Sequence, residues 1–342
     1  MDETTLQQGL AQAVDAALLY QLHLPPQTRY TFRHVLIQDA AYQSLLRRTR
    51  QLYHRRIAQA LERHFPEIRK AHPELLAHHY AGAGLYRQAT TYWHQAAQDA
   101  MGRSAHLEAL AHLRQGIALC AVLLETPGRL QLELALQMAL GVVLTATQGY
   151  AAAEVEIAYG RARELCQDGG DTTQLFAVSR GLWYVHLVRG ALPRAYEIAQ
   201  QLLRLAQDTN DLSLRMEAYR AVGISLFLLG ELNLAWSHLE RGMRLYDPER
   251  HRALLIHYGQ DSGAVYLGYA AWTLWLRGYP EQALSNINEV LMWAKQLAHP
   301  YSQGLALIFA AWLHQWRREP QAALAKVEAS MALAHEHQLP LL

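Results

Sequence analysis

Residues 190–208 read GALPRAYEIAQQLLRLAQD, a turn with glycine followed by one amphipathic helix. Ala195, Ile198 and Leu202 recur at the three- and four-residue spacing that places side chains on one face of a helix. Pro193 stands near the start, where the first turn of a helix tolerates proline. The stretch therefore predicts a helix with one buried face, which other helices must cover.

The same unit recurs along the chain. Related stretches begin at Gly84, Gly230, Gly278 and Arg318. An alanine follows each turn by four or five residues, at Ala89, Ala195, Ala235, Ala283 and Ala323. A small residue there lets paired helices approach closely. Because Gly190, Gly230 and Gly278 are 40 and 48 residues apart, each unit has room for two helices.

This period is longer than the ~34 residues of a strict tetratricopeptide repeat. We therefore expect an all-α, tetratricopeptide-like helical solenoid. It should be a right-handed superhelix, continuous from about residue 72 to 338, with the first helix of each pair on its inner face. The ending HQLPLL offers no polar cap, so the C-terminal edge should expose apolar side chains and favour self-association.

The first 33 residues follow a different pattern. A helix over about Thr5–Ala16 precedes two β-prone runs, Ala17–His23 and Arg29–Arg33, which the turn LPPQT separates. Helix, hairpin and long helix is the order in which a winged-helix domain ends. We therefore predict a winged-helix remnant over 1–33, a long connecting helix over 34–70 and the repeat array over 71–342. The hairpin should pack on the long helix, because two strands alone are marginally stable.

The composition narrows the range of functions. Hydrophobic residues make up 51% of the 342 and charged residues 18%, so the chain needs extensive burial. With 31 Lys and Arg against 30 Asp and Glu, no overall field attracts nucleic acid or an anionic membrane. Cys120 and Cys166 have no ligand spacing around them and fit a reducing cytosol. The uncharged stretch Leu134–Ala153 is interpreted as two buried helices meeting at a turn, and we expect a cytoplasmic protein.

No catalytic or cofactor-binding motif is found in the sequence. It contains no phosphate-binding GxxxxGK[ST] loop, no GxSxG elbow and no HExxH or CxxC pair. The arginines of residues 47–63 spread around a helix and predict a solvated face, not a DNA contact. Positions on helix surfaces and hydrogen bonds between helices are favoured over a metal site for His72, His78, His79, His335 and His337. We predict no enzymatic activity, no cofactor and no metal.

Aromatic residues crowd the last third of the chain, and most should be core. A solenoid leaves one concave face open, however, and Tyr and Trp make such a face adhesive. The least regular stretch, Leu245–Gly263, leads into this region. We predict an interior groove around 258–275 whose partner-binding residues are Tyr258, Gln260, Asp261, Tyr266, Tyr269 and Trp272. Assignment of these residues to the core alone is the alternative.

The stretches FRHVLIQDAAYQSLLRRTRQLYHRRIAQALE (32–62) and PELLAHHYAGAGLYRQATTYWHQAA (73–97) resemble a known family. Its members are large bacterial signal-transduction ATPases, in which a class III adenylate/guanylate cyclase-like domain and an AAA-type STAND ATPase precede helical repeats. The resemblance continues through GYAAAEVEIAYGRARELC (149–166) and YDPERHRALLIHYGQDSGA (246–264). It implies that this chain corresponds to the winged-helix tail and the repeat sensor that follow the ATPase.

The resemblance also implies a role for His34. In STAND ATPases the winged-helix domain carries a Met-His-Asp motif whose histidine reaches the β-phosphate of bound ADP. His34 matches that histidine in position, although Val35 replaces the aspartate. His34 would then be a nucleotide sensor only together with an ATPase domain. A histidine that merely caps the following helix is an equally open alternative.

These observations predict a non-catalytic interaction or sensor module. It would bind a protein or small effector and so regulate a linked ATPase or cyclase. One alternative is an adenylate/guanylate cyclase or ATP-binding protein, which the missing phosphate-binding loop disfavours. A second is a fragment of a DNA-binding transcriptional regulator, which the near-neutral charge disfavours.

Overall fold

A computed structural model describes residues 3–24, 27–167, 171–247 and 261–337. These residues form helices and one two-stranded sheet, and they divide into two compact units. The first unit comprises residues 1–99 and 114–123, and the second unit comprises 100–113 and 124–342. The division passes through helices α6 (Tyr86–Gly102) and α7 (His106–Cys120).

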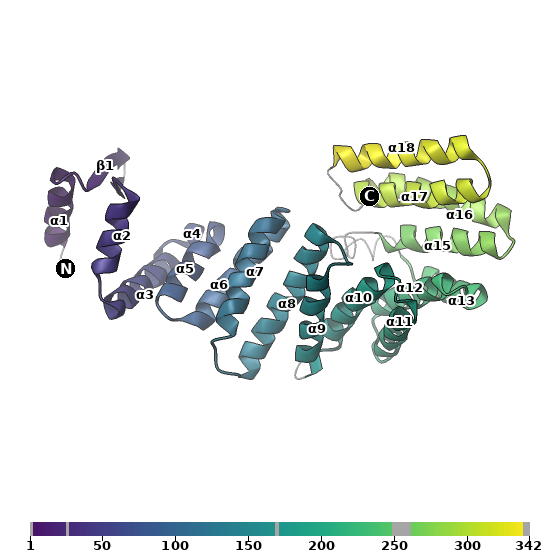
Figure 1. The fold of residues 1–342 in the computed structure, drawn as a ribbon, viewed down its shortest axis with the longest axis horizontal. Coiled ribbons are helices and arrows are strands. Elements are labelled where there is room, and N and C mark those ends of the chain that lie inside the picture. The colour runs from purple at the N-terminus through teal and green to yellow at the C-terminus, as the bar shows by residue number, and fades with distance from the viewer. Residues whose placement is uncertain (1–2, 25–26, 168–170, 248–260, 338–342) are drawn as a thin grey trace. The chain divides into compact units, whose positions relative to one another are not determined.

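The first unit begins with the predicted helix and hairpin. It contains α1 (Glu3–Asp15), β1 (Leu19–Leu24), β2 (Gln27–Phe32), α2 (Val35–Ser44), α3 (Arg47–His64), α4 (Pro66–Ala71) and α5 (Pro73–Gly82). The strands are antiparallel and pair Leu19 with Phe32 and Leu24 with Gln27. Strand β1 contacts α1, and β2 contacts α2. Figure 1 shows α1, β1 and α2 as neighbours. Leu19 is buried, whereas Tyr20, Leu22 and Phe32 are exposed. The hairpin is expected to pack on the helix that follows it, but helices bury only part of its apolar side chains.

The prediction of one long helix over 34–70 is wrong. The segment is broken after α2 and again after α3. Leu45 and Leu46 are extended, and the Ser44 hydroxyl donates to the carbonyl of Ala41, which competes with the helical pattern. The second break precedes Pro66, because a residue before proline is disfavoured in the helical region.

The second unit is built from helix pairs. The pairs are α8 (Pro127–Gln148) with α9 (Ala153–Gln167), α10 (Thr172–Val188) with α11 (Leu192–Gln207), α12 (Leu212–Leu228) with α13 (Leu232–Met243), α15 (Ser262–Leu276) with α16 (Pro280–Leu297), and α17 (Pro300–Trp316) with α18 (Pro320–Glu336). Helices α15 to α18 lie side by side (Figure 1). This alternation confirms the two-helix unit that the glycine spacing predicts.

The turns inside the four pairs that follow α9 share one backbone geometry. Gly190, Gly230 and Gly278 have φ values of 74°, 84° and 86°, in the left-handed region that glycine adopts without steric cost. Arg318 holds the equivalent position before α18 with a φ of 61°. In each turn the residue that follows donates its N–H to a carbonyl of the preceding helix, as Ala191 does to His186. The predicted unit boundaries therefore coincide with helix C-caps.

The repeated alanines lie in the core, as predicted. Ala89, Ala195, Ala235 and Ala283 are completely buried. Ala323 in α18 is only half-buried, and no described helix follows α18. The large residues Phe176, Trp183, Ile198 and Leu202 fill the space between helices in the second unit. Small residues thus allow close helix approach, and large ones supply the buried apolar area.

The interpretation of the uncharged stretch 134–153 as two helices that meet at a turn is confirmed. Helix α8 continues up to Gln148, the turn begins at Gly149, and α9 begins at Ala153. Within the described residues α8 is the one helix long and apolar enough to cross a membrane, and 44% of its apolar window is buried inside the protein. Its Glu133 carboxylate accepts from Arg161 of α9 at 2.8 Å and pairs with Arg129 at 2.9 Å. These contacts identify α8 as the partner of α9 in a helix pair.

Candidate functional site

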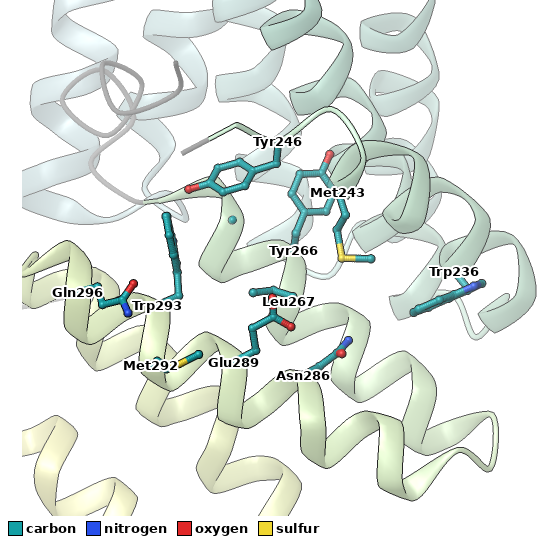
Figure 2. A pocket seen from close by; sticks show the side chains of 11 residues that line it. Trp236, Met243, Tyr246, Tyr266, Leu267, Asn286, Glu289, Met292, Trp293 and Gln296 are labelled. Carbon is teal, nitrogen blue, oxygen red and sulfur yellow. The ribbon is translucent and has the colours of Figure 1, made fainter. Parts of the chain in front are cut away.

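A hollow of about 550 Å³ opens beside α15 in the second unit. Helices α13 and α16 form its other sides, and Figure 2 shows the side chains that face it. Most of the described lining is aromatic or apolar: Trp236, Met243, Tyr246, Tyr266, Leu267, Met292 and Trp293. The polar lining comes from α16, with Asn286, Glu289 and Gln296. This combination of an apolar wall and a few polar groups is typical of a ligand-binding pocket.

Helix periodicity explains the contribution of α16. Asn286, Glu289, Trp293 and Gln296 follow one another at spacings of three, four and three residues. Such spacing places side chains on one face of a helix. On α15 the lining includes Gly263, where an added Cβ would meet the Tyr246 ring at 2.5 Å. Glycine at 263 therefore allows the Tyr246 ring to lie against α15.

The Asp261 carboxylate fixes two of the aromatic walls. Asp261 is buried and caps α15, accepting from the backbone N–H of Ala264 at 2.8 Å. It also accepts from the Tyr246 hydroxyl at 2.8 Å and from the Trp293 indole N–H at 3.1 Å. Burial and the neighbouring Asp261 raise the pKa of Tyr246, so the phenol stays protonated and donates. One carboxylate thus ties the end of α13 and the face of α16 to the start of α15.

Tyr266 forms a fixed wall of the hollow. It is fully buried, and its hydroxyl donates to the backbone carbonyl of Met216 in α12. An added Cβ at Gly242 would lie 2.0 Å from the Tyr266 hydroxyl oxygen, so glycine makes room for the phenol. The ring is therefore anchored at both its backbone and its hydroxyl end.

Behind the start of α15 lies a buried charged network. The Glu217 carboxylate of α12 accepts from Arg180 of α10 at 3.3 Å and from Arg220 at 2.5 Å. The Ser262 hydroxyl of α15 donates to the same carboxylate, and Arg220 donates to the Tyr184 hydroxyl at 2.7 Å. Burial alone would raise the pKa of Glu217, but Arg220 and Arg180 outweigh it and lower the pKa to about 2. The network joins three successive repeats around one ionised carboxylate.

The structure separates the residues that the sequence groups as one site. Tyr258 and Gln260 lie outside the described residues. Tyr266 lines the hollow, and Asp261 lies behind its walls. Tyr269 and Trp272 instead pack with Phe309 of α17, at ring-centroid distances of 5.3 and 4.7 Å. The reason is helix geometry, since six residues turn Trp272 about 120° away from Tyr266.

Sequence reasoning missed Glu289, Asn286 and Gln296. Their spacing with Trp293 is a visible signal of a helix face. The signal alone does not distinguish a solvated face from one that borders a hollow, because both are half polar. Which helices pack opposite α16 determines whether this face borders a hollow or solvent.

The histidines of the first unit form interhelical contacts. His54 of α3 and His79 of α5 lie 3.0 Å apart at their Nδ1 atoms, and the Tyr42 hydroxyl of α2 lies 2.9 Å from Nε2 of His54. Burial, then His54 and His78, lower the pKa of His79 to about 4. The predicted interhelical hydrogen bond is thus confirmed for His79. Within the described ranges, no group of three or more His, Cys, Asp or Glu side chains is arranged to hold a metal ion.

His34 is exposed and caps α2. Its Nδ1 atom accepts from the backbone N–H of Leu36 at 3.2 Å. Accepting at Nδ1 places the ring proton on Nε2, which leaves this donor directed away from the cap. His34 therefore acts as the N-cap of α2, as the capping alternative predicts. Nucleotide sensing by His34 stays a prediction.

Comparison with solved structures identifies the fold. A Rap protein complexed with competence and sporulation factor superposes with a TM-score of 0.58 at 9% identity, covering 89% of this chain and 87% of that one. A Signal Transduction ATPase with Numerous Domains (STAND) protein with a tetratricopeptide repeat sensor from Pyrococcus horikoshii gives a TM-score of 0.53 at 12% identity. That match covers 84% of this chain and 48% of the STAND protein. The fold is a tetratricopeptide-like helical repeat.

No protein-family model matches this tetratricopeptide-like chain. An uncharacterised protein of Rhizobium meliloti (strain 1021) is 27% identical over 340 residues. The match covers 97% of this chain and 33% of that protein. The chain therefore spans about a third of the length of the curated relative that it matches.

Proposed function

We propose that this chain is the effector-binding sensor of a signal-transduction ATPase, and that the hollow beside α15 is its binding site. Tetratricopeptide-like repeats of this kind form interaction or regulatory modules. An effector, either a small molecule or a protein segment, binds in the hollow and changes how the repeats act on a linked ATPase or cyclase. The chain itself performs no catalysis.

The lining of the hollow is the observation that carries this proposal. Its volume of about 550 Å³ falls inside the ~300–1,000 Å³ range of small-molecule sites. Tyr246 and Trp293 are held in place by Asp261, and Tyr266 by Met216, so the walls need little ordering when a ligand binds. Preformed walls reduce the entropy cost of binding.

The surface of the first unit supports a link to further protein. Tyr20, Leu22 and Phe32 on the hairpin and Val35 and Leu36 on α2 are exposed apolar residues that lie close together in the sequence. Exposed apolar patches mark interaction sites. We infer that residues 1–33 complete a winged-helix domain, that 34–70 connect it to the array over 71–342, and that the ATPase packs on this surface. The greater length of the Rhizobium relative agrees with additional domains.

Filling the hollow tests the binding site. Glu289→Trp places a large side chain into the hollow from an exposed helix position, whereas Lys295→Trp adds the same ring at an exposed position of α16 outside the lining. Native mass spectrometry follows the purified chain after incubation with fractionated bacterial extract. We expect a bound mass with the wild type and Lys295→Trp, and none with Glu289→Trp. Equal retention by all three proteins would contradict the proposal.

An activity assay separates this proposal from the enzymatic alternative. The purified chain should neither hydrolyse ATP nor form a cyclic nucleotide above the rate of a buffer blank. Turnover that co-purifies with the chain through successive columns and disappears in a point variant would overturn the sensor assignment.

A further inference from the structure

We propose that the hollow binds a small organic cation, an ammonium or guanidinium group attached to an apolar body. This inference rests on the proposed function and names the chemical class of its effector. Three features of the described residues lead to it: the charge of the lining, the carboxylate behind the aromatic walls, and the aromatic faces themselves.

The lining carries negative charge. Glu289 is the one charged side chain among the described residues that line the hollow, and its carboxylate points into it (Figure 2). No ion pair joins Glu289 to another side chain in the part of the chain that the structure describes. A carboxylate at the edge of an apolar site is best satisfied by a cation that also contacts the apolar walls.

A second carboxylate lies directly behind two of the walls. Asp261 accepts the Tyr246 hydroxyl and the Trp293 indole N–H. Donating a hydrogen bond to a carboxylate increases the electron density of an aromatic ring, and the negative ring face is the part that attracts a cation. Asp261 therefore adds to the field of Glu289 without occupying the hollow.

The Trp236 ring, which lines the other end of the hollow, already contacts a cation of the chain that is not itself part of the lining. The Arg277 guanidinium lies 5.5 Å from the centroid of the Trp236 ring and donates to Asn233. A ligand cation is repelled from this end and attracted to the end formed by Glu289 and Trp293. The apolar body of the ligand then lies along Leu267 and Met243.

Matched probes distinguish charge from shape. Phenethylamine, 2-phenylethanol and 3-phenylpropionate share a phenyl ring and differ in a positive, neutral or negative end. Titration is followed by tryptophan fluorescence excited at 295 nm, where the probes do not absorb. We expect the amine to bind the wild type about tenfold more tightly than the alcohol, in line with a cation–π contact and one carboxylate. The propionate should bind more weakly than both.

Charge and filling variants then separate the two proposals. Glu289→Gln keeps the shape and should reduce the preference for the amine to less than about threefold. Glu328→Gln, an exposed acid on α18, serves as the control and should leave it unchanged. Glu289→Trp should abolish binding of all three probes.

Each outcome is decisive. A wild type that binds the neutral or anionic probe as tightly as the amine, or binds none of them, overturns the cation proposal. So does an unchanged preference in Glu289→Gln. The proposed binding function is tested separately. It stands, even if the cation proposal fails, when Glu289→Trp loses the extract compound that the wild type retains in native mass spectrometry. A cationic peptide that binds the wild type but not Glu289→Trp, while the amine does not bind, would identify a protein partner and overturn the small-molecule assignment.

Discussion

The Nε atom of Arg180 in α10 lies 3.3 Å from an Oε atom of Glu217 in α12, and both side chains are buried. Arg220 binds the same carboxylate, so two guanidinium groups share one acid in the interior of the second unit. Removing charges from water is costly, and the interaction offsets that cost only while all partners are present. Because Ser262 also donates to Glu217, this carboxylate connects the structural core to the start of α15 and hence to the hollow.

Glu217→Gln should destabilise the protein strongly. The substitution keeps the shape but leaves two buried guanidinium groups without their carboxylate, which costs about 3–5 kcal/mol. The free energy of unfolding in urea, followed by circular dichroism, measures the effect. Glu197→Gln removes an exposed carboxylate paired with Arg194 and should change stability by less than about 0.5 kcal/mol. Equal effects of the two variants would show that the buried network is not stabilising.

The same carboxylate predicts acid sensitivity. The folded pKa of Glu217 is about 2, below the 4.5 of an ordinary glutamate. The unfolded chain therefore binds the proton first, so the contribution of Glu217 to stability is complete above pH 4.5 and is lost as the pH falls towards 2. Urea midpoints measured between pH 5 and pH 3 should fall more steeply for the wild type than for Glu217→Gln. Parallel slopes would contradict this assignment.

His79 predicts a second pH dependence at milder pH. Its folded pKa is about 4, whereas the free side chain has 6.5. Protons therefore bind preferentially to the unfolded chain between these values, and the stability of the α3–α5 contact falls as the pH drops from 6.5 to 4. His79→Gln should flatten the change in urea midpoint between pH 7.5 and pH 5. His72→Gln, which replaces an exposed histidine of the same unit, should leave the wild-type slope. A slope that survives in His79→Gln would exclude this contact as the cause.

Arg318→Gly should stabilise the protein. Arg318 has a φ of 61° at the turn where the other helix pairs of the second unit have glycine. A residue with a side chain in this left-handed backbone region costs about 1–2 kcal/mol. Part of the gain is lost because glycine has more freedom in the unfolded chain, which leaves a net gain of about 0.5–1 kcal/mol. Gly190→Arg is the converse control, since open space surrounds Gly190 and only the backbone conformation opposes the change. If both variants were neutral, the turn geometry would not limit stability.

Helix α18 should promote self-association. Leu324, Val327 and Met331 are 58%, 41% and 58% exposed and share one face of the helix. Leu324→Glu combined with Met331→Lys should lower the average mass in light scattering after gel filtration and raise solubility. Ala329→Lys adds a charge about 200° around the helix from Val327 and should leave the mass unchanged. A wild type that is monomeric at all concentrations would refute this prediction.

The helices and their turns follow from local patterns in the sequence. Glycines at 190, 230 and 278 adopt a positive φ, prolines stand in the first turns of α11 and α16, and the alanines that follow lie in the core. These features are local, because backbone sterics and the 3.6-residue period act within a few residues. They were sufficient to predict the tetratricopeptide-like fold, and the β-prone runs on either side of LPPQT were sufficient to predict the N-terminal hairpin.

The candidate site, in contrast, depends on contacts between helices that are far apart in the sequence. The hollow needs side chains from α13, α15 and α16, and Asp261 binds the indole of Trp293, 32 residues further along the chain. No local rule predicts which face of α16 meets that carboxylate, or that Trp272 turns away to pack on Phe309. No proline or glycine marks the break between α2 and α3, where the Ser44 hydroxyl bonds locally to the carbonyl of Ala41 and His54 of α3 contacts Tyr42 of α2 across the break. Such contacts depend on how the helices pack, and the packing is determined by all the facing side chains together.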